Sequence, residues 1–146
     1  MSGRAAAAGF ALPVRVYYED TDAGGVVYYA NYLKFLERGR SEWLRHLGFD
    51  QAALARDPGI LFVVAGLTID YRRPARFDEA LSVSVAIAER SRAAVRFAQQ
   101  VRRGEELLVE AEVRVACVDA ASFRPTPWPA ALAAALTVTH PSGAHR

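Results

Sequence analysis

Three acidic side chains and two glycines fall within seven residues near the start of the chain, in the segment EDTDAGGVVYYANY (residues 19–32). A carboxylate such as that of Asp22 can act as a general base or attack a carbonyl carbon directly. The pair Gly24–Gly25 predicts a tight turn, and a helix is expected to begin near Tyr29. Because the first N–H groups of a helix are unpaired, they can stabilise a developing oxyanion. An acid folded back toward such donors could hydrolyse an activated acyl group such as a thioester.

Two other interpretations of these acids remain open on spacing alone. Asp20 and Asp22 could be turn formers or helix caps, which are common roles for aspartate. Glu19, Asp20 and Asp22 could instead hold Mg²⁺ through oxygen ligands. A strand followed by D-x-D also resembles the opening motif of haloacid-dehalogenase-type phosphatases. Gly24 stands where those enzymes carry Thr or Val, however, and no later strand ends in paired acids.

The elements around the acids are a short strand and one long helix. The segment VRVYY, from Val14, is rich in β-branched and aromatic residues and predicts a strand that ends at the acids. The segment ANYLKFLERGRSEWLRHLG predicts a helix of about 18 residues that ends at Gly48. Its apolar face is expected to contain Leu33, Leu36, Trp43 and Leu47, widened by Phe35 and Leu44. Gly39, in the middle, indicates close approach by another backbone.

The rest of the chain predicts four long strands with turns near Pro74, Ser91 and Gly104. In the last of them, alternation places Leu107, Val109, Ala111, Val113, Val115 and Cys117 on one face. Consecutive strands with short loops favour an antiparallel sheet, and a long apolar helix must be covered. We therefore expect an α+β domain in which a curved antiparallel sheet of about five strands wraps round one long central helix.

The stretch VRVYYEDTDAGGVVYYANYLKFLERGRSEWLR resembles the signature of the hotdog-fold acyl-CoA thioesterases. It is most similar to the YbgC-type branch, which is associated with the Tol–Pal system, within the 4-hydroxybenzoyl-CoA thioesterase family. The resemblance runs from about Val14 to Val118 and includes the phrases FVV at 62–64, YRRPARFDE at 71–79 and EAEVRVACVD at 110–119. It implies the hotdog fold, hydrolysis of an acyl-CoA to a free acid and CoA, and no cofactor.

The resemblance also assigns roles to residues. Asp22, the second acid of the D-x-D, would be catalytic, and the backbone N–H of Tyr29 would be the oxyanion donor. Asp20 and Glu19 would then be structural or would modulate Asp22. The YbgC-type branch usually has histidine where this chain has Tyr29, whereas the 4-hydroxybenzoyl-CoA branch has tyrosine, so only the backbone role is carried over. The candidate substrate-binding residues are Tyr28 and the arginines of YRRPAR, namely Arg72, Arg73 and Arg76.

The arginines have a chemical rationale, since forked guanidinium groups suit the phosphates of CoA, although a solvated strand end explains them equally well. The resemblance further implies a homo-oligomer, a tetramer built from two hotdog dimers, in the cytoplasm. A catalytically silent acyl-binding or scaffolding protein, and a thioesterase acting on acyl-carrier protein, are the alternatives. No metal ion is expected at the site.

Composition sets the remaining limits. With 146 residues and a net charge of +2, the chain fits one domain and gives no sign of nucleic-acid binding. A single cysteine, Cys117, excludes an intramolecular disulfide and is expected to pack in the core. No apolar run approaches the roughly 20 residues that span a bilayer, and the alanine-rich start is interpreted as a loose extension rather than a signal peptide.

These observations predict a flexible extension over residues 1–12, one hotdog domain over 13–137 and a flexible tail over 138–146, which contains His140 and His145. Ser41 and His46 lie five apart on one helix and point in different directions, so they are not expected to form a nucleophile–base pair. Trp43 is expected to pack in the core, and Glu37 to be a surface or interface charge.

Overall fold

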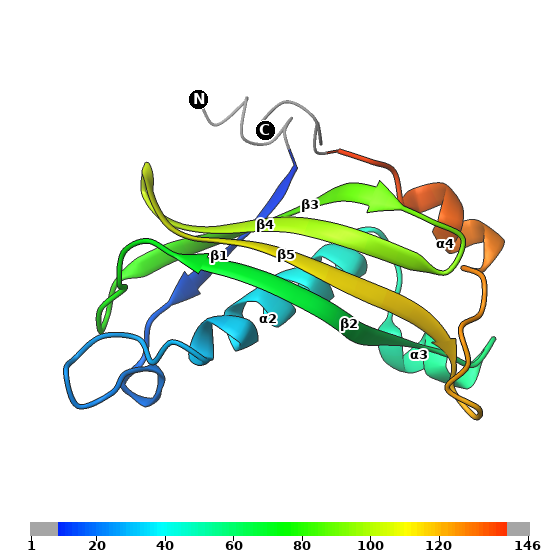
Figure 1. The fold of residues 1–146 in the computed structure, drawn as a ribbon, viewed down its shortest axis with the longest axis horizontal. Helices are drawn as coiled ribbons and strands as arrows, with labels where there is room; N and C mark the ends of the chain where they lie inside the picture. Colours follow the sequence, from blue (N-terminus) through cyan, green and yellow to red (C-terminus); the bar gives the residue numbers. More distant parts are fainter. Residues whose placement is uncertain (1–8, 140–146) are drawn as a thin grey trace.

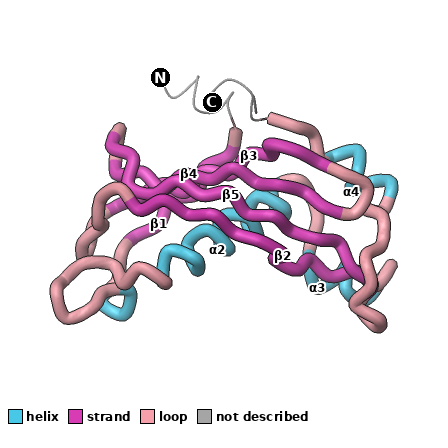
Figure 2. The backbone as a smooth tube through the Cα atoms, in the orientation of Figure 1, coloured by secondary structure: helices cyan, strands magenta, loops and turns pink. Residues whose placement is uncertain are grey.

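Five antiparallel strands form one curved sheet, and the long helix α2 lies against one face of it (Figure 1; the strand curvature is clearest in Figure 2). The computed structural model describes residues 9–139. The strand order is β1-β3-β4-β5-β2, so β1 and β2 are the edges. The α+β hotdog architecture expected from the sequence is confirmed. In chain order the elements are β1 (Phe10–Arg15), the 3₁₀ turn η1 (Tyr18–Asp20), α2 (Asn31–His46), α3 (Gln51–Arg56), β2 (Ile60–Tyr71), β3 (Ala80–Arg90), β4 (Ala94–Arg103), β5 (Glu106–Asp119) and α4 (Ala130–Ala135).

Alternation along β5 follows the prediction over most of the strand and fails at one end. Val109, Ala111 and the further odd-numbered residues to Cys117 are buried. At Leu107 the prediction is wrong, because Leu108 is buried instead. The register between β4 and β5 shifts there, since Val101 pairs with Val109 but the next residue of β4 pairs with Leu107. The extra residue of this bulge, Leu108, takes the core position.

The buried face of α2 is also rotated from the one predicted. Tyr32, Phe35, Leu36, Gly39 and Leu44 are buried, whereas Leu33 is 39% exposed and therefore lies outside the core. The cause is the contact at the middle of the helix. A Cβ on Gly39 would lie 3.0 Å from Val83 Cγ1 and 3.3 Å from Gln99 Nε2. Side chains of β3 and β4, rather than another backbone, thus explain the glycine.

The buried amide of Gln99 fixes the helix on the sheet. Gln99 is 1% exposed, and its Nε2 donates to the carbonyl oxygens of Leu36 in α2 (3.1 Å) and Ser84 in β3 (3.3 Å). Its Oε1 accepts from Arg40 Nη1 at 3.0 Å. Because a buried amide is costly unless it is hydrogen-bonded, these contacts set the position of α2 along the strands.

The predicted ends of the domain need adjustment. Strand β1 begins at Phe10, which pairs with Val85 of β3, so the extension expected over residues 1–12 is too long. Thr139 donates its N–H to Ile87 O (2.9 Å) and accepts from Ile87 N at its hydroxyl (3.0 Å), so the part of the tail up to residue 139 is held against β3. Residues 1–8 and 140–146, with His140 and His145, lie outside the described residues. Between residues 9 and 139, no helix has the length and apolar character needed to cross a bilayer.

Candidate active site

The acidic segment forms a small hairpin between β1 and α2, at the end of the sheet opposite α3 and α4 (Figure 1). Tyr28 N–H donates to Asp20 O (3.0 Å) and Asp22 N–H to Val26 O (2.9 Å), with a bridge between Thr21 and Val27. The acids therefore lie on a hairpin arm. The expectation that they end a strand is wrong, because β1 stops at Arg15.

The glycine pair closes this hairpin. Gly25 has φ +81, a left-handed conformation that favours glycine. Gly24 N–H donates to Asp22 Oδ1 at 2.8 Å, and a Cβ on Gly24 would lie 3.3 Å from that oxygen. The Gly-Gly sequence thus lets the backbone turn tightly beside the Asp22 carboxylate. This is the reason that two glycines follow the acids at once.

Asp20 is the buried acid of the D-x-D pair. It is 4% exposed, and its carboxylate accepts from Tyr17 N–H (2.8 Å) and from Asn31 Nδ2 (2.9 Å). Asn31 is the first residue of α2, so this carboxylate ties the turn η1 to the start of the helix. A buried carboxylate committed to protein donors is a structural group, which agrees with the role that the resemblance implies for Asp20.

Asp22 is the exposed acid. Its Oδ1 accepts from Gly24 N–H, and no other hydrogen bond or ion pair reaches the carboxylate from the rest of residues 9–139. The second oxygen is therefore open to a ligand or to water. Of the two aspartates, only Asp22 has a free oxygen atom with which to do chemistry.

The helix entry presents backbone donors that no acceptor within residues 9–139 uses, and the Tyr29 N–H is one of them. Tyr28 O accepts from Asn31 N–H at 2.8 Å, and Tyr29 O accepts from the Tyr71 hydroxyl at 3.1 Å. Within residues 9–139 the Tyr29 N–H has no acceptor. The helix itself begins at Asn31, slightly after the predicted start. Tyr29 directly follows the hairpin arm that pairs with residues 20–22, so the hairpin brings the arm of Asp22 beside the chain entering the helix.

Exposed tyrosine rings surround this donor. Tyr28, Tyr29 and Tyr71 are 50%, 63% and 42% exposed. The ring centroids of Tyr28 and Tyr29 are 5.0 Å apart, and those of Tyr29 and Tyr71 are 6.1 Å apart in an edge-to-face arrangement. Sequence reasoning missed Tyr71, because the phrase YRRPAR drew attention only to its arginines. Its place as the last residue of β2, beside those arginines, is the one signal the sequence offered.

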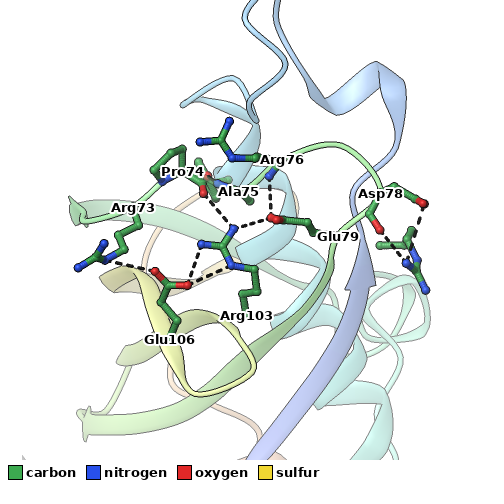
Figure 3. A network of polar contacts seen from close by, with 10 residues as sticks. Arg73, Pro74, Ala75, Arg76, Asp78, Glu79, Arg103 and Glu106 are labelled. Atoms are coloured by element: carbon green, nitrogen blue, oxygen red, sulfur yellow. Dashed lines mark hydrogen bonds and ion pairs between the residues drawn. The ribbon is translucent and has the colours of Figure 1, made fainter.

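The three arginines of YRRPAR do not converge on one point. Arg72 forms ion pairs with Asp70 (3.2 Å) and Glu110 (3.0 Å), and Arg73 Nε lies 3.3 Å from Glu106 Oε2. Arg72 and Arg73 thus bind carboxylates at the strand ends. The Arg76 guanidinium points away from the neighbouring ion pairs (Figure 3), and none of the described carboxylates lies within ion-pair distance of it.

An ion-pair network that was not predicted from the sequence supports the loop between β2 and β3 (Figure 3). Arg103 Nη1 donates to Glu79 Oε1 (2.6 Å) and to Pro74 O (3.3 Å), and its Nη2 lies 2.8 Å from Glu106 Oε1. Burial by itself raises the pKa of Glu79, but hydrogen bonds from Arg76 N–H and Arg103 outweigh it, so that the pKa lies below its usual value. The network holds residues 74–79 against the end of the sheet.

A pocket opens farther along α2, between the helix and β2, β4 and β5. Its walls are mainly apolar, with Trp43, Phe62 and Phe97 among the lining residues and Glu37 and Arg40 at its polar side. Burial lowers the pKa of Arg40, and the charge of Glu37 opposes that effect. Trp43 packs edge-to-face on Phe97 at 5.3 Å, as its helical spacing suggested, and it also lines this pocket.

The other reactive side chains have structural roles. The Ser41 hydroxyl donates to Glu37 (3.4 Å) and accepts from Gln51 (3.1 Å), while the His46 ring packs on Phe10, so no Ser–His pair forms. Cys117 is fully buried, and burial raises the pKa of its thiol to about 11. In the described part of the chain, no three His, Cys, Asp or Glu side chains are arranged to hold a metal ion.

Comparison with known proteins identifies the family to which the chain belongs. The profile of the thioesterase-like superfamily matches residues 16–136. The acyl-CoA thioesterase YbgC of Haemophilus influenzae is 47% identical over 127 residues, which cover 87% of this chain and 93% of that protein. The acyl-CoA thioester hydrolase YbgC of an Escherichia coli strain is 46% identical over 126 residues, covering 86% and 93%.

Solved structures give the same result. A probable thioesterase from Bartonella henselae superposes with a TM-score of 0.80 at 39% sequence identity, covering 83% of this chain and 99% of that one. A fold match of that quality places the central helix and the curved sheet in the same arrangement. The chain therefore belongs to the thioesterase-like superfamily and has the hotdog fold, and it is similar over most of its length to the YbgC acyl-CoA thioesterases.

Proposed function

We propose that this protein is an acyl-CoA thioesterase, which hydrolyses an acyl-CoA to the free acid and CoA. The observation that carries the proposal is an open carboxylate oxygen on Asp22, in one arm of a hairpin, together with an unpaired N–H on Tyr29, which directly follows the other arm. The identity with YbgC acyl-CoA thioesterases over most of the chain supports it.

In this reaction the thioester carbonyl oxygen accepts a hydrogen bond from the Tyr29 N–H. As water attacks the carbonyl carbon, the Asp22 carboxylate takes its proton, and the negative charge that develops on oxygen is stabilised by the N–H. Collapse of the tetrahedral intermediate breaks the C–S bond, and the proton held by Asp22 passes to the CoA thiolate. In the alternative course, Asp22 itself attacks, and water hydrolyses the resulting mixed anhydride.

The substrate would be recognised by groups on both sides of this centre. Arg76 is the arginine of YRRPAR that we propose for the CoA phosphates, because Arg72 and Arg73 are already bound to carboxylates. The exposed rings of Tyr28 and Tyr29 would flank the thioester. The apolar pocket that begins at Glu37 lies six residues beyond the start of α2, about 9 Å along the helix axis. We propose that it receives the distal part of a longer acyl chain.

We further propose that the enzyme is a homo-oligomer joined through the edge strand β2. One edge of β2 is hydrogen-bonded to β5, and its other edge pairs with no strand within residues 9–139. Three apolar residues of β2 are also exposed: Val64 (50%), Leu67 (43%) and Tyr71 (42%). An open apolar edge is a template for pairing with a second copy. Two such dimers would make the tetramer. For the cell, we propose a cytoplasmic enzyme associated with the Tol–Pal system. Light scattering tests this interface: if β2 joins the subunits, the Leu67→Arg variant should have a lower particle mass than the wild type.

The function is tested by free-thiol release from a panel of thioesters with EDTA present. The panel contains short, long and aromatic acyl-CoAs and one acyl-carrier-protein thioester. Release from CoA thioesters that is unaffected by EDTA supports the proposal and identifies the acyl class. Release from the carrier-protein thioester alone would show that the substrate is an acyl-carrier-protein thioester and not an acyl-CoA. Tight binding of an acyl-CoA without release would identify an acyl-binding protein instead.

A further inference from the structure

The hydroxyl of Tyr71 contacts the backbone that carries the proposed oxyanion donor. Tyr71 is the last residue of β2, and its Oη donates to Tyr29 O at 3.1 Å, across 42 positions of sequence. The other donor to this carbonyl, Tyr32 N–H, is at the longer distance of 3.4 Å. The strand end is thereby joined to the residue whose N–H faces the substrate.

A buried aromatic ring holds Tyr71 in place. The centroids of Tyr71 and Tyr32 lie 5.7 Å apart. Tyr32 is 3% exposed, and its hydroxyl accepts from Ala75 N–H at 3.0 Å, so it is anchored to the loop after β2. Desolvation, with a smaller contribution from Tyr29, raises the pKa of Tyr71, so the hydroxyl keeps its proton at neutral pH and remains a donor.

The residue before the donor is held as well. Tyr28 N–H donates to Asp20 O, and Tyr28 O accepts from Asn31 N–H. The Asn31 side chain is fixed in turn by the buried Asp20 carboxylate at 2.9 Å. Tyr28 O, which shares a planar peptide group with the Tyr29 N–H, is therefore hydrogen-bonded, and so is Tyr29 O in the following peptide group, while the Tyr29 N–H is left free. A donor held in this way needs no reorganisation as charge develops on the substrate.

We infer that Tyr71 is a positioning residue that sets the direction of the Tyr29 N–H toward the thioester oxygen. The inference rests on the proposed function. It acts by holding the Tyr29–Ala30 peptide group, which is joined through the Tyr29 Cα to the peptide group that carries the Tyr29 N–H, and it requires no contact between Tyr71 and the substrate. Loss of the hydroxyl would release this peptide group, let the Tyr29 Cα and its N–H shift, and weaken the oxyanion contact without removing it.

The test compares Tyr71→Phe with wild type on the best acyl-CoA of the panel. We expect kcat to fall about tenfold, the order of one net hydrogen bond, with KM changed by less than about twofold. Tyr18→Phe is the matched control, because Tyr18 is 78% exposed and its hydroxyl has no hydrogen-bond partner within residues 9–139. The control should keep the wild-type kcat and unfolding temperature, whereas Tyr71→Phe, which loses one hydrogen bond, should unfold at most a few degrees lower and stay folded in the assay.

A spectroscopic reading separates positioning from a general structural effect. In an Asp22→Asn background the thioester should be hydrolysed at least about 10²-fold more slowly, so the infrared stretch of a ¹³C-labelled thioester carbonyl can be recorded before turnover and reports the hydrogen bond from Tyr29. Adding Tyr71→Phe should move this band back toward its position in water. If Tyr71→Phe changed neither the band nor kcat, the inference about Tyr71 would be overturned. Hydrolysis by the wild type would still support the proposed function. Absence of hydrolysis in the wild type would overturn the proposed function itself.

Discussion

Exchanging each aspartate of the D-x-D for asparagine separates the structural acid from the reactive one. Asp20→Asn keeps the size of the side chain but replaces one acceptor oxygen by an NH₂ group. Both oxygens of Asp20 accept from donors, Tyr17 N–H and Asn31 Nδ2. In the variant, the NH₂ group either faces one of these buried donors or requires the Asn31 amide to turn over and accept from it, and the bonds that remain lose their charge assistance.

The size of the effect follows from these two contacts. A buried donor left without an acceptor costs about 1–3 kcal/mol, and hydrogen bonds to charged groups contribute more than neutral ones. We expect Asp20→Asn to lower the free energy of unfolding by about 2–4 kcal/mol, a large part of the roughly 5–15 kcal/mol of a typical domain. Asp22→Asn should change it by less than about 0.5 kcal/mol, because the Asn oxygen can still accept from Gly24 N–H and Asn suits the same turn.

Urea denaturation followed by circular dichroism measures both variants. With a slope of about 2 kcal/mol per molar urea, Asp20→Asn should lower the midpoint by about 1–2 M, and Asp22→Asn should leave it in place. If Asp20→Asn were as stable as the wild type, or if Asp22→Asn were the less stable variant, the division of roles between the two acids would be wrong.

Three further predictions concern the helix, the loop arginine and the cysteine. Gly39→Ala gains about 1 kcal/mol of helix propensity but introduces a Cβ 3.3 Å from Gln99 Nε2 and closer still to β3, so overpacking of about 1–3 kcal/mol should make the net change in a thermal melt destabilising. Arg76→Gln should raise KM for acyl-CoA at unchanged kcat and leave hydrolysis of the matching acyl-pantetheine unaffected, whereas Arg45→Gln, on the far half of α2, should change neither. Because burial raises the pKa of the Cys117 thiol from its ordinary value of 9.0 to about 11, the thiol should not react with a thiol reagent at pH 8 until the protein unfolds. Its contribution to stability should be complete below pH 9 and be lost as the pH rises toward 11.

Local patterns in the sequence were sufficient to predict the elements of the fold. β-Branched alternation located the long strands, and the apolar spacing after residue 30 located α2. The exact faces were not predictable, because they depend on contacts between distant segments. The bulge that buries Leu108 is set by pairing with β4, and the rotation of α2 is set by Gln99 beneath Gly39. Neither partner is visible from the helix or the strand alone.

Only part of the candidate site could be predicted, because the rest also depends on contacts between distant segments. Spacing could not tell Asp20 from Asp22, and the family resemblance made that assignment. The structure adds a physical basis, since burial and two donors commit Asp20 to the fold while Asp22 keeps an open oxygen. The hydroxyl of Tyr71 and the pairing of Arg103 with Glu79 were missed, because they join residues 42 and 24 positions apart with no short motif to link them.

The decisive experiment for the role of Asp22 compares the rate of acyl-CoA hydrolysis by Asp22→Asn with that of the wild type in EDTA. Because we expect this variant to be as stable as the wild type, a loss of rate can be assigned to the chemistry. We expect kcat to fall by about 10² to 10⁴, the usual contribution of a general base, with the variant folded and still binding substrate. A folded Asp22→Asn protein that turns over at a rate near that of the wild type would contradict this role.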